Sequence, residues 1–240
     1  MIKVHSLSKK YNGVTVLDIE ELEVPRGQSF GLVGNNGAGK TTLFSCLLDL
    51  IQPTTGYIEN GGVKVNESEA WKSQTSSFID DSFLIGYLTP EEYFYFIGEL
   101  RGQNKADVDK LLAGFEDFFN DEIIGKKKYL RDLSKGNQKK AGIVATLIGN
   151  PDVIVLDEPF ANLDPTTQIR LKGIIKELAA DPDITVLVSS HDLIHVTEVC
   201  KRIVVLEKGK LVKDIITSPA TLKELEDYFS GENISLETEA

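Results

Sequence analysis

One short glycine-rich segment, residues 34 to 41, constrains this chain more than any other. It reads Gly-Asn-Asn-Gly-Ala-Gly-Lys-Thr, and it follows the apolar run 29–33 and precedes the apolar pattern 43–48. The pattern G-x-x-x-x-G-K-S/T lets a backbone with few side chains curl around a phosphate, with its N–H groups and the positive end of the next helix directed at the anion. We therefore predict strand, loop and helix, with Lys40 reaching the β- and γ-phosphates of a nucleotide and Thr41 ligating Mg²⁺.

The alternative for this segment is a glycine-rich turn that binds nothing. The segment follows a strand pattern and precedes a helix pattern, and this context favours a phosphate-binding loop over a simple turn. The residues expected to contact nucleotide here are Gly34, Asn35, Asn36, Gly37, Ala38, Gly39, Lys40, Thr41 and Thr42.

Composition narrows the class of protein around this loop. The 240 residues, 41% of them hydrophobic, suffice for one α/β domain with a lobed insertion. The net charge of −11 argues against a long-range field that attracts nucleic acid or an anionic membrane surface. No apolar run approaches the length of a membrane span, the start of the chain reads as a strand rather than a signal peptide, and Cys46 and Cys200 fit buried thiols. We expect a cytoplasmic, reduced protein.

The order of elements indicates an α/β core interrupted by helices. Residues 2 to 33 are rich in strand signals, and residues 89 to 132 carry mainly helical ones, beginning at Thr89-Pro90. A further helix is expected over 139–149. The aromatic run 93–96 fits core, although part of it suits a docking surface. From residue 150 strands and helices alternate again, with strands over 152–159, 184–190, 202–207 and 210–215 and helices over 165–180, 192–200 and 219–229.

Two carboxylates end the continuous apolar strand that begins at residue 152. The carboxyl ends of strands are where open α/β sheets present ligand-binding groups. Phosphoryl transfer needs one carboxylate to hold Mg²⁺ and a second to orient or deprotonate the attacking water. Asp157 suits the first role and Glu158 the second. Two merely solvated carboxylates are the alternative, which the phosphate loop elsewhere in the chain disfavours.

A histidine follows the next buried strand and is expected at the same sheet edge. His191 is placed to hydrogen-bond a γ-phosphate. The sequence from His191 to His195, His-Asp-Leu-Ile-His, also approximates the H-E-x-x-H zinc motif. It has Asp where the motif has Glu, and the sequence offers no candidate for a third zinc ligand. We interpret His195 and His5 as structural or surface residues.

Two weaker signals complete the set. Ser134, in Leu133-Ser-Lys-Gly136, is expected to cap a helix whose free N–H groups bind an anion, with Gly136 allowing close approach. Tyr11 suits stacking on a nucleotide base, or equally an ordinary surface or core position.

These elements occur in the order of one known family. The chain resembles the nucleotide-binding subunit of an ATP-binding cassette (ABC) transporter over residues 1 to 215. The resemblance implies a P-loop NTPase core with a mainly parallel sheet, an N-terminal antiparallel β subdomain and a helical insertion. We expect core residues at 1–80 and 150–230, the helical subdomain at 81–149 and a disordered acidic tail at 231–240.

The resemblance also implies roles for particular residues. Tyr11 would stack on adenine, Lys40 and Thr41 belong to Walker A, and Asp157 and Glu158 belong to Walker B, with Glu158, His191 and Lys40 catalytic. The remaining implied residues are Ser134 and Gly136 of the signature motif and Asp164 of the D-loop. The expected ligands are ATP and Mg²⁺.

The chain departs from the family pattern at two places. Lys135 and Asn137 replace a glycine and a glutamine of the signature Leu-Ser-Gly-Gly-Gln, a variant that resembles exporter-type members. Asp80 or Asp81 stands where the Q-loop glutamine is usual. An aspartate there is within the range of ligands for Mg²⁺, so Asp80 joins Thr41 and Asp157 as an expected metal ligand.

In this family the signature motif of one subunit closes over the nucleotide of another. The resemblance therefore implies a homodimer with ATP at its interface. The dimer would drive an integral-membrane transporter subunit docked at the groove between the helical insertion and the core, on the inner face of the cell membrane. No nucleic-acid partner is expected. The alternatives are a soluble ABC ATPase that acts on ribosomes or nucleic acid, and a small-molecule kinase or GTPase.

Overall fold

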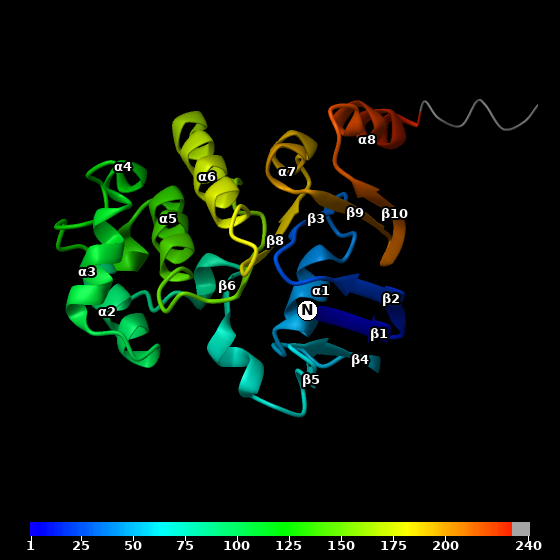
Figure 1. Ribbon diagram of the computed structural model, residues 1–240, viewed down its shortest axis with the longest axis horizontal. Helices are drawn as coiled ribbons and strands as arrows, with labels where there is room; N and C mark the ends of the chain where they lie inside the picture. Colours follow the sequence, from blue (N-terminus) through cyan, green and yellow to red (C-terminus); the bar gives the residue numbers. More distant parts are fainter. Residues whose placement is uncertain (232–240) are drawn as a thin grey trace, which may run out of the picture.

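The computed structural model describes residues 1–231 and contains two sheets (Figure 1). The smaller sheet is antiparallel and has the strand order β2(Val14–Val24), β1(Ile2–Tyr11), β4(Thr55–Asn60), β5(Val63–Lys64). The larger has the order β10(Lys210–Ile216), β9(Arg202–Glu207), β3(Ser29–Val33), β8(Thr185–Ser190), β7(Val153–Leu156), β6(Thr75–Phe78). Its strands are parallel except for the β9–β10 hairpin. The predicted fold class is thus confirmed.

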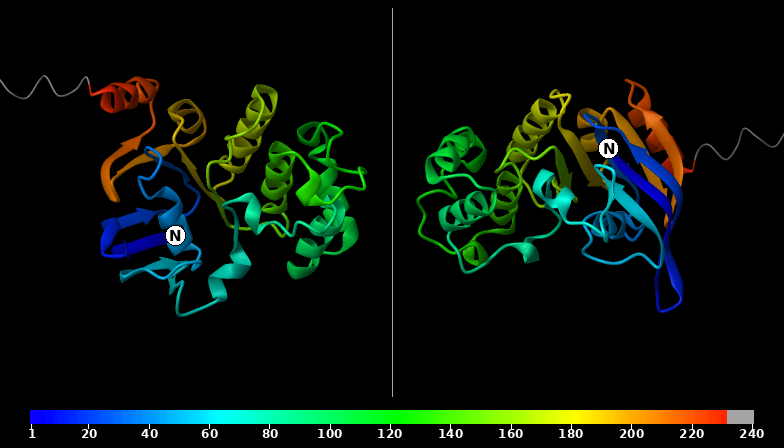
Figure 2. Two further views of the ribbon diagram at one scale, coloured as in Figure 1. Left: turned by 180° about the vertical axis from the view of Figure 1, so that it is seen from behind. Right: turned by 60° about the horizontal axis from the view of Figure 1, so that its bottom comes forward.

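Helices cover both faces of the larger sheet. On one face α1(Lys40–Leu47) fills the space toward the antiparallel sheet, and on the other lie α5(Lys135–Ala145), α6(Pro165–Leu178), α7(Leu193–Val199) and α8(Thr221–Ser230) (Figures 1 and 2). Because successive side chains of a strand point to opposite faces, Val153 and Val155 pack with the α1 side while Ile154 and Leu156 pack with the α5–α6 side. Burial on both faces explains why these strands read as continuous apolar runs.

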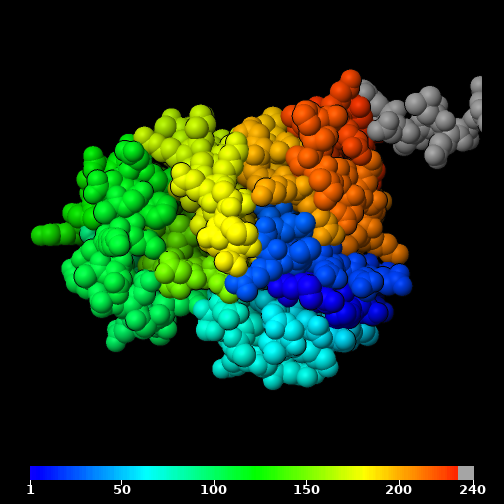
Figure 3. Space-filling view, viewed as in Figure 1, coloured from blue at the N-terminus to red at the C-terminus, as the bar shows by residue number. Residues whose placement is uncertain are grey.

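The helical insertion forms a lobe beside the sheet (Figure 3). It contains α2(Pro90–Leu100), α3(Lys105–Ala113), α4(Glu116–Phe119) and the start of α5. Thr89 begins α2 with a capping box, accepting from the Glu92 N–H while the Glu92 carboxylate accepts from the Thr89 N–H, as the Thr-Pro-Glu-Glu signal predicts. In the aromatic run, Tyr93 and Phe94 are buried whereas Phe96 is exposed.

Several predicted boundaries are wrong. Helix α5 begins at Lys135, directly after its cap Ser134, and ends at Ala145, whereas the apolar pattern pointed to residues 139–149. The predicted strand 152–159 is limited to β7, because Asp157 and the residues after it turn away toward the site. Short 3₁₀ turns at Ala70–Gln74, Asp81–Phe83 and Leu130–Asp132 occupy segments without a clear periodic signal. The acidic tail expected from residue 231 lies outside the described residues, apart from Gly231.

Candidate functional site

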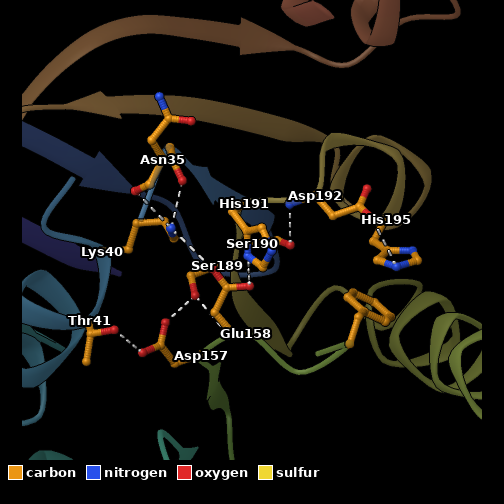
Figure 4. Close-up of polar contacts among 12 residues, drawn as sticks. Asn35, Lys40, Thr41, Asp157, Glu158, Ser189, Ser190, His191, Asp192 and His195 are labelled. Atoms are coloured by element: carbon orange, nitrogen blue, oxygen red, sulfur yellow. Dashed lines mark hydrogen bonds and ion pairs between the residues drawn. The ribbon is translucent and has the colours of Figure 1, made fainter. Parts of the chain in front are cut away.

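Three parallel strands deliver the predicted site residues to one edge of the larger sheet. Strand β8 lies between β3 and β7, with Val33 opposite Ser190 and Leu156 opposite Val188. The segments that follow these strands therefore begin side by side, as Figure 4 shows for the phosphate loop, the Asp157–Glu158 pair and His191. The carboxyl edge of the sheet is the expected place for a ligand in such a fold.

The phosphate loop is shaped to surround an anion. Gly37 and Gly39 have φ of +82° and +111°, values that side-chain-bearing residues seldom adopt. Helix α1 begins at Lys40 with no side-chain cap and no acidic residue in its first turn, so no neighbouring carboxylate competes for its first N–H groups. Lys40 is 6% exposed, and its Nζ donates to the carbonyl oxygens of Gly34 at 2.7 Å and Asn35 at 3.4 Å.

A hydroxyl and a carboxylate meet beside this loop. Thr41 Oγ1 donates to Asp157 Oδ2 at 2.5 Å, and the Ser189 hydroxyl donates to the other Asp157 oxygen. Burial raises the pKa of Asp157, while these two hydrogen bonds act in the opposite direction. Paired hydroxyl and carboxylate oxygens suit a hard cation such as Mg²⁺, so the residues present fit the expected ion.

Glu158 is held by four neighbours. Its backbone has φ of +46°, its N–H donates to Ser189 Oγ at 3.0 Å, and its carbonyl accepts from Lys139 Nζ at 2.7 Å. Its carboxylate lies 3.2 Å from Lys40 Nζ and 2.9 Å from His191 Nδ1. Among the described residues, no donor is aligned on the buried Oε1 oxygen. It is the oxygen that lies 3.2 Å from Lys40 Nζ, so a ligand that draws the lysine away would free it to accept a proton from water.

The structure does not bring all of the predicted residues to this edge. Ser134 is exposed at the start of α5, where it accepts from the Asn137 N–H at 3.2 Å. Asp164 caps α6 through the Thr167 N–H at 3.0 Å. Within residues 1–231, no hydrogen bond or ion pair joins either residue to the phosphate loop, and Figures 1 and 2 show α5 apart from α1.

Asp80 does not join the magnesium pair in this structure. Its Oδ1 accepts from the Ser82 N–H at 2.8 Å, and hydrogen bonding to Ser82 lowers its pKa. Among the described contacts, none links Asp80 to Thr41 or Asp157. Asp81 instead forms an ion pair with Lys135 at 2.9 Å, so the two positions that depart from the family pattern contact each other.

Two other predicted residues occupy simple settings. Tyr11 ends β1 with 47% of its surface exposed, and Lys9 Nζ lies over its ring, 4.9 Å from the ring centre. His195 does not share a ligand set with His191: its ring packs on Phe160 and its Nε2 lies 3.5 Å from Asp192. Cys46 and Cys200 are buried thiols as predicted.

Sequence reasoning missed Ser189 and Lys139. Ser189 lies on β8 and contacts the Asp157 carboxylate and the Glu158 N–H after the neighbouring strand β7; its position follows from strand register rather than from any local motif. Lys139 stands four residues after Lys135 on α5, and that spacing on one helix face was the available signal.

We predict that Asp157→Asn stabilises the protein in the absence of nucleotide and divalent metal. Removing a charge that burial disfavours is expected to raise the Tm near pH 7 by about 2–4 °C, equivalent to roughly 1 kcal/mol for a chain of this size. The pKa of Asp157 is higher in the folded protein than in the unfolded chain. The free energy of unfolding of the parent therefore rises as the pH falls from the folded pKa to the unfolded pKa. The advantage of the variant should therefore shrink in acid.

The measurement is thermal unfolding with EDTA at several pH values between neutral and acid. Asp152→Asn, which alters an exposed carboxylate paired with Arg26, serves as control and should change the Tm little. The prediction would be wrong if Asp157→Asn had a lower Tm than the parent at neutral pH, or if its Tm gain over the parent grew in acid. Either result would show that the buried Asp157 charge does not destabilise the folded protein.

Comparisons with known proteins identify relatives of this chain. A family model described as ABC transporter matches residues 17–161. An uncharacterised ABC transporter ATP-binding protein of Methanocaldococcus jannaschii is 36% identical over 213 residues, which cover 88% of this chain and 76% of that protein. The bacitracin transport ATP-binding protein BcrA of Enterococcus faecalis is 31% identical over 221 residues, or 90% of this chain and 69% of that protein.

Two solved structures share the fold. One is described as the ATP-binding subunit of an ABC transporter; it is 26% identical with a TM-score of 0.81, and the match covers 96% of this chain and 93% of that one. The other is a dimeric ATP-binding cassette bound to ADP and phosphate, 21% identical with a TM-score of 0.80, covering 91% of this chain and 99% of that one. Within residues 1–231, no helix has the length and mean hydropathy that crossing a membrane requires.

Proposed function

The chain belongs to the ABC transporter ATP-binding family, and we propose that it hydrolyses ATP as one half of a dimer to power transport through a separate membrane subunit. The observation that carries the proposal is the junction of Lys40, Glu158 and His191 at the end of three neighbouring strands. It provides a phosphate cradle, a base and an orienting group within direct contact of one another.

The residues of the loop would bind the triphosphate. Lys40 now satisfies its charge on the carbonyls of Gly34 and Asn35 and on the Glu158 carboxylate. Phosphate oxygens would replace these partners, so that the ammonium contacts the nucleotide and Glu158 Oε1 is free to contact the attacking water. His191 holds the other carboxylate oxygen and supplies a nitrogen close to the terminal phosphate. Tyr11 would stack on the base.

Thr41 and Asp157 would hold Mg²⁺. When bound, this ion neutralises charge on the phosphates of the reacting nucleotide. Ser189 fixes the Asp157 carboxylate through one oxygen, leaving the oxygen that faces Thr41 for the metal side. Ser189 also holds the Glu158 N–H, so one hydroxyl sets the positions of both carboxylates.

The site is proposed to be completed by a second copy of the chain. Ser134 is exposed at the start of α5, where its side chain caps the Asn137 N–H. The other backbone N–H groups of this first turn suit the γ-phosphate of a nucleotide held by another subunit. Gly136 lies next to the 160–164 segment, because a Cβ at this position would meet the Asn162 carbonyl at 3.2 Å. Asp164 ends that segment and caps α6. A homodimer in head-to-tail arrangement then contains two equivalent sites.

The groove for the membrane subunit is proposed between the helical insertion and the sheet. A hollow of about 270 Å³ lies there, lined by Ser76 from β6, by Tyr93, Ile97 and Leu100 from α2, and by Thr146 after α5. The mixture of apolar and hydroxyl side chains suits a peptide segment of another protein. Docking here would place the protein on the inner face of the cell membrane. Because the signature variant with Lys135 and Asn137 resembles exporter-type members, we expect the direction of transport to be export.

Purification of the tagged protein from native membranes tests the partner. We expect an integral-membrane protein with several spans to co-purify, and Leu100→Glu to lose most of it because the exposed Leu100 side chain borders the groove. Leu50→Glu alters another exposed leucine, outside the groove, and should retain the partner. Consistent absence of a membrane protein would refute the transport role.

Recovery of ribosomes or salt-sensitive nucleic acid instead would support the soluble ABC ATPase, the alternative from another class. The acidic composition and the names of the relatives do not favour it. Phosphate transfer to a metabolite would favour a small-molecule kinase. That alternative gives the signature segment, residues 133–136, no role.

A further inference from the structure

We propose that Lys139 is a positioning residue for hydrolysis, which fixes Glu158 through its main-chain carbonyl and links it to the helix that serves the partner subunit. The inference rests on the proposed role of Glu158 as the base. Lys139 itself is not expected to touch ATP.

The first support is the environment of the Lys139 ammonium. The side chain is 7% exposed, and Nζ lies 2.7 Å from the Glu158 carbonyl oxygen. Burial lowers the pKa of Lys139, while the charges of Asp81, Glu158, Asp157 and Asp80 act in the opposite direction. Burying an ammonium is costly unless it is well paired, so an apolar residue would suit this helix position better for stability alone.

The second support is the backbone of Glu158. Its left-handed conformation, with φ of +46°, costs about 1–2 kcal/mol for a residue with a side chain and persists only where neighbours enforce it. Ser189 holds the N–H, and Lys139 holds the carbonyl oxygen. Both peptide groups flanking the Glu158 side chain are thus anchored, and the direction in which its Cβ points is set by these two contacts.

The third support is the set of other residues on α5 that contact, or are proposed to contact, the two nucleotide sites. Lys135, one turn before Lys139, pairs with Asp81 in the segment after β6. Ser134 and Gly136, on the same turn, are the residues proposed to reach the nucleotide of the partner. One rigid helix therefore contacts the base of its own site with one residue and the partner's site with others. A shift of α5 on binding the partner's nucleotide would be felt at Glu158 through Lys139.

A purely structural role is the competing explanation, and the chain offers a matched control for it. Lys140, the next residue, is 3% exposed and pairs with Glu122 at 2.9 Å on the side of the helical insertion. Lys139→Met and Lys140→Met each remove a buried ammonium from the same helix, but only the first removes a contact to Glu158.

The test measures kcat, KM and the Kd for ATP in the full-length protein. We expect Lys139→Met to lower kcat by about 10–100-fold, the range that a small misplacement of a catalytic group produces, with the Kd for ATP within about twofold. Lys140→Met should keep kcat within about threefold, and Lys139→Arg, which retains a cationic donor, within about fivefold. Thermal unfolding verifies folding, and Lys139→Gln replaces Lys139→Met should the latter not fold.

The decisive arm is the Glu158→Gln background. If Lys139 acts through Glu158, adding Lys139→Met to Glu158→Gln should change the residual rate by less than about twofold. The inference would be overturned if Lys139→Met kept the parent kcat. It would also be overturned if Lys139→Met lowered the rate of Glu158→Gln by the same factor as it lowers the rate of the parent. Hydrolysis at the parent rate in Glu158→Gln alone would instead refute the proposed function, so the two failures are distinguishable.

Discussion

Glu158→Gln is expected to bind ATP as the parent does and to hydrolyse it about 10²–10⁴-fold more slowly, the loss typical of a missing general base. Glutamine keeps the shape of the side chain and a hydrogen-bonding partner for His191. It has no carboxylate to accept a proton from water at the position of the buried Oε1 oxygen. Single-turnover hydrolysis and equilibrium dialysis of ATP measure the two effects separately.

Glu198→Gln is the control for this substitution. It makes the same chemical change on α7, where Glu198 pairs with Lys172 rather than with any site residue, and it should hydrolyse ATP at the parent rate. If Glu158→Gln retained the parent rate, another group would have to be the base. Loss of ATP binding would mean that Glu158 mainly holds Lys40 in place.

The second large effect is expected at Gly136, far along the chain from the phosphate loop. Gly136→Asp places a carboxylate where the proposed partner nucleotide brings its γ-phosphate, and its Cβ would press on the Asn162 carbonyl at 3.2 Å. Repulsion between like charges in a site that excludes water should lower hydrolysis by at least about 10²-fold. Binding of ATP to the individual subunit should be unchanged, because this residue contacts no part of its own loop.

Gly173→Asp is the matched control, since a Cβ at Gly173 meets no atom within 4 Å. Sedimentation velocity with ATP adds a second readout. We expect a dimer for Glu158→Gln and a monomer when Gly136→Asp is added. Full hydrolysis by Gly136→Asp would mean that the signature segment has no part in the reaction.

The sequence predicted the parts of the site that depend on local pattern. The phosphate loop, the carboxylates after β7 and His191 after β8 all follow from strand ends that read clearly, because strands buried on both faces give unbroken apolar runs. Their convergence follows in turn from the parallel arrangement of the strands.

The contacts that tune the site were not predictable in the same way. Ser189 reaches Asp157 and Glu158 only through the register of β7 and β8, and Lys139 reaches the Glu158 carbonyl only because α5 begins at Lys135. The apolar pattern alone put this helix four residues later, since its first turn consists of polar residues. The Asp81–Lys135 pair likewise joins segments 54 residues apart, and no local signal connects them.

The claim that the loop is half of a composite site is tested most directly by mixing two inactive variants. Lys40→Met lacks the cation of the phosphate loop but has an intact signature segment, and Gly136→Asp has the reverse defect. Mixed dimers contain one complete site, so an equal mixture should recover up to about one quarter of the parent ATPase rate, because about half of the dimers are mixed. A mixture as inactive as its two components would contradict the account.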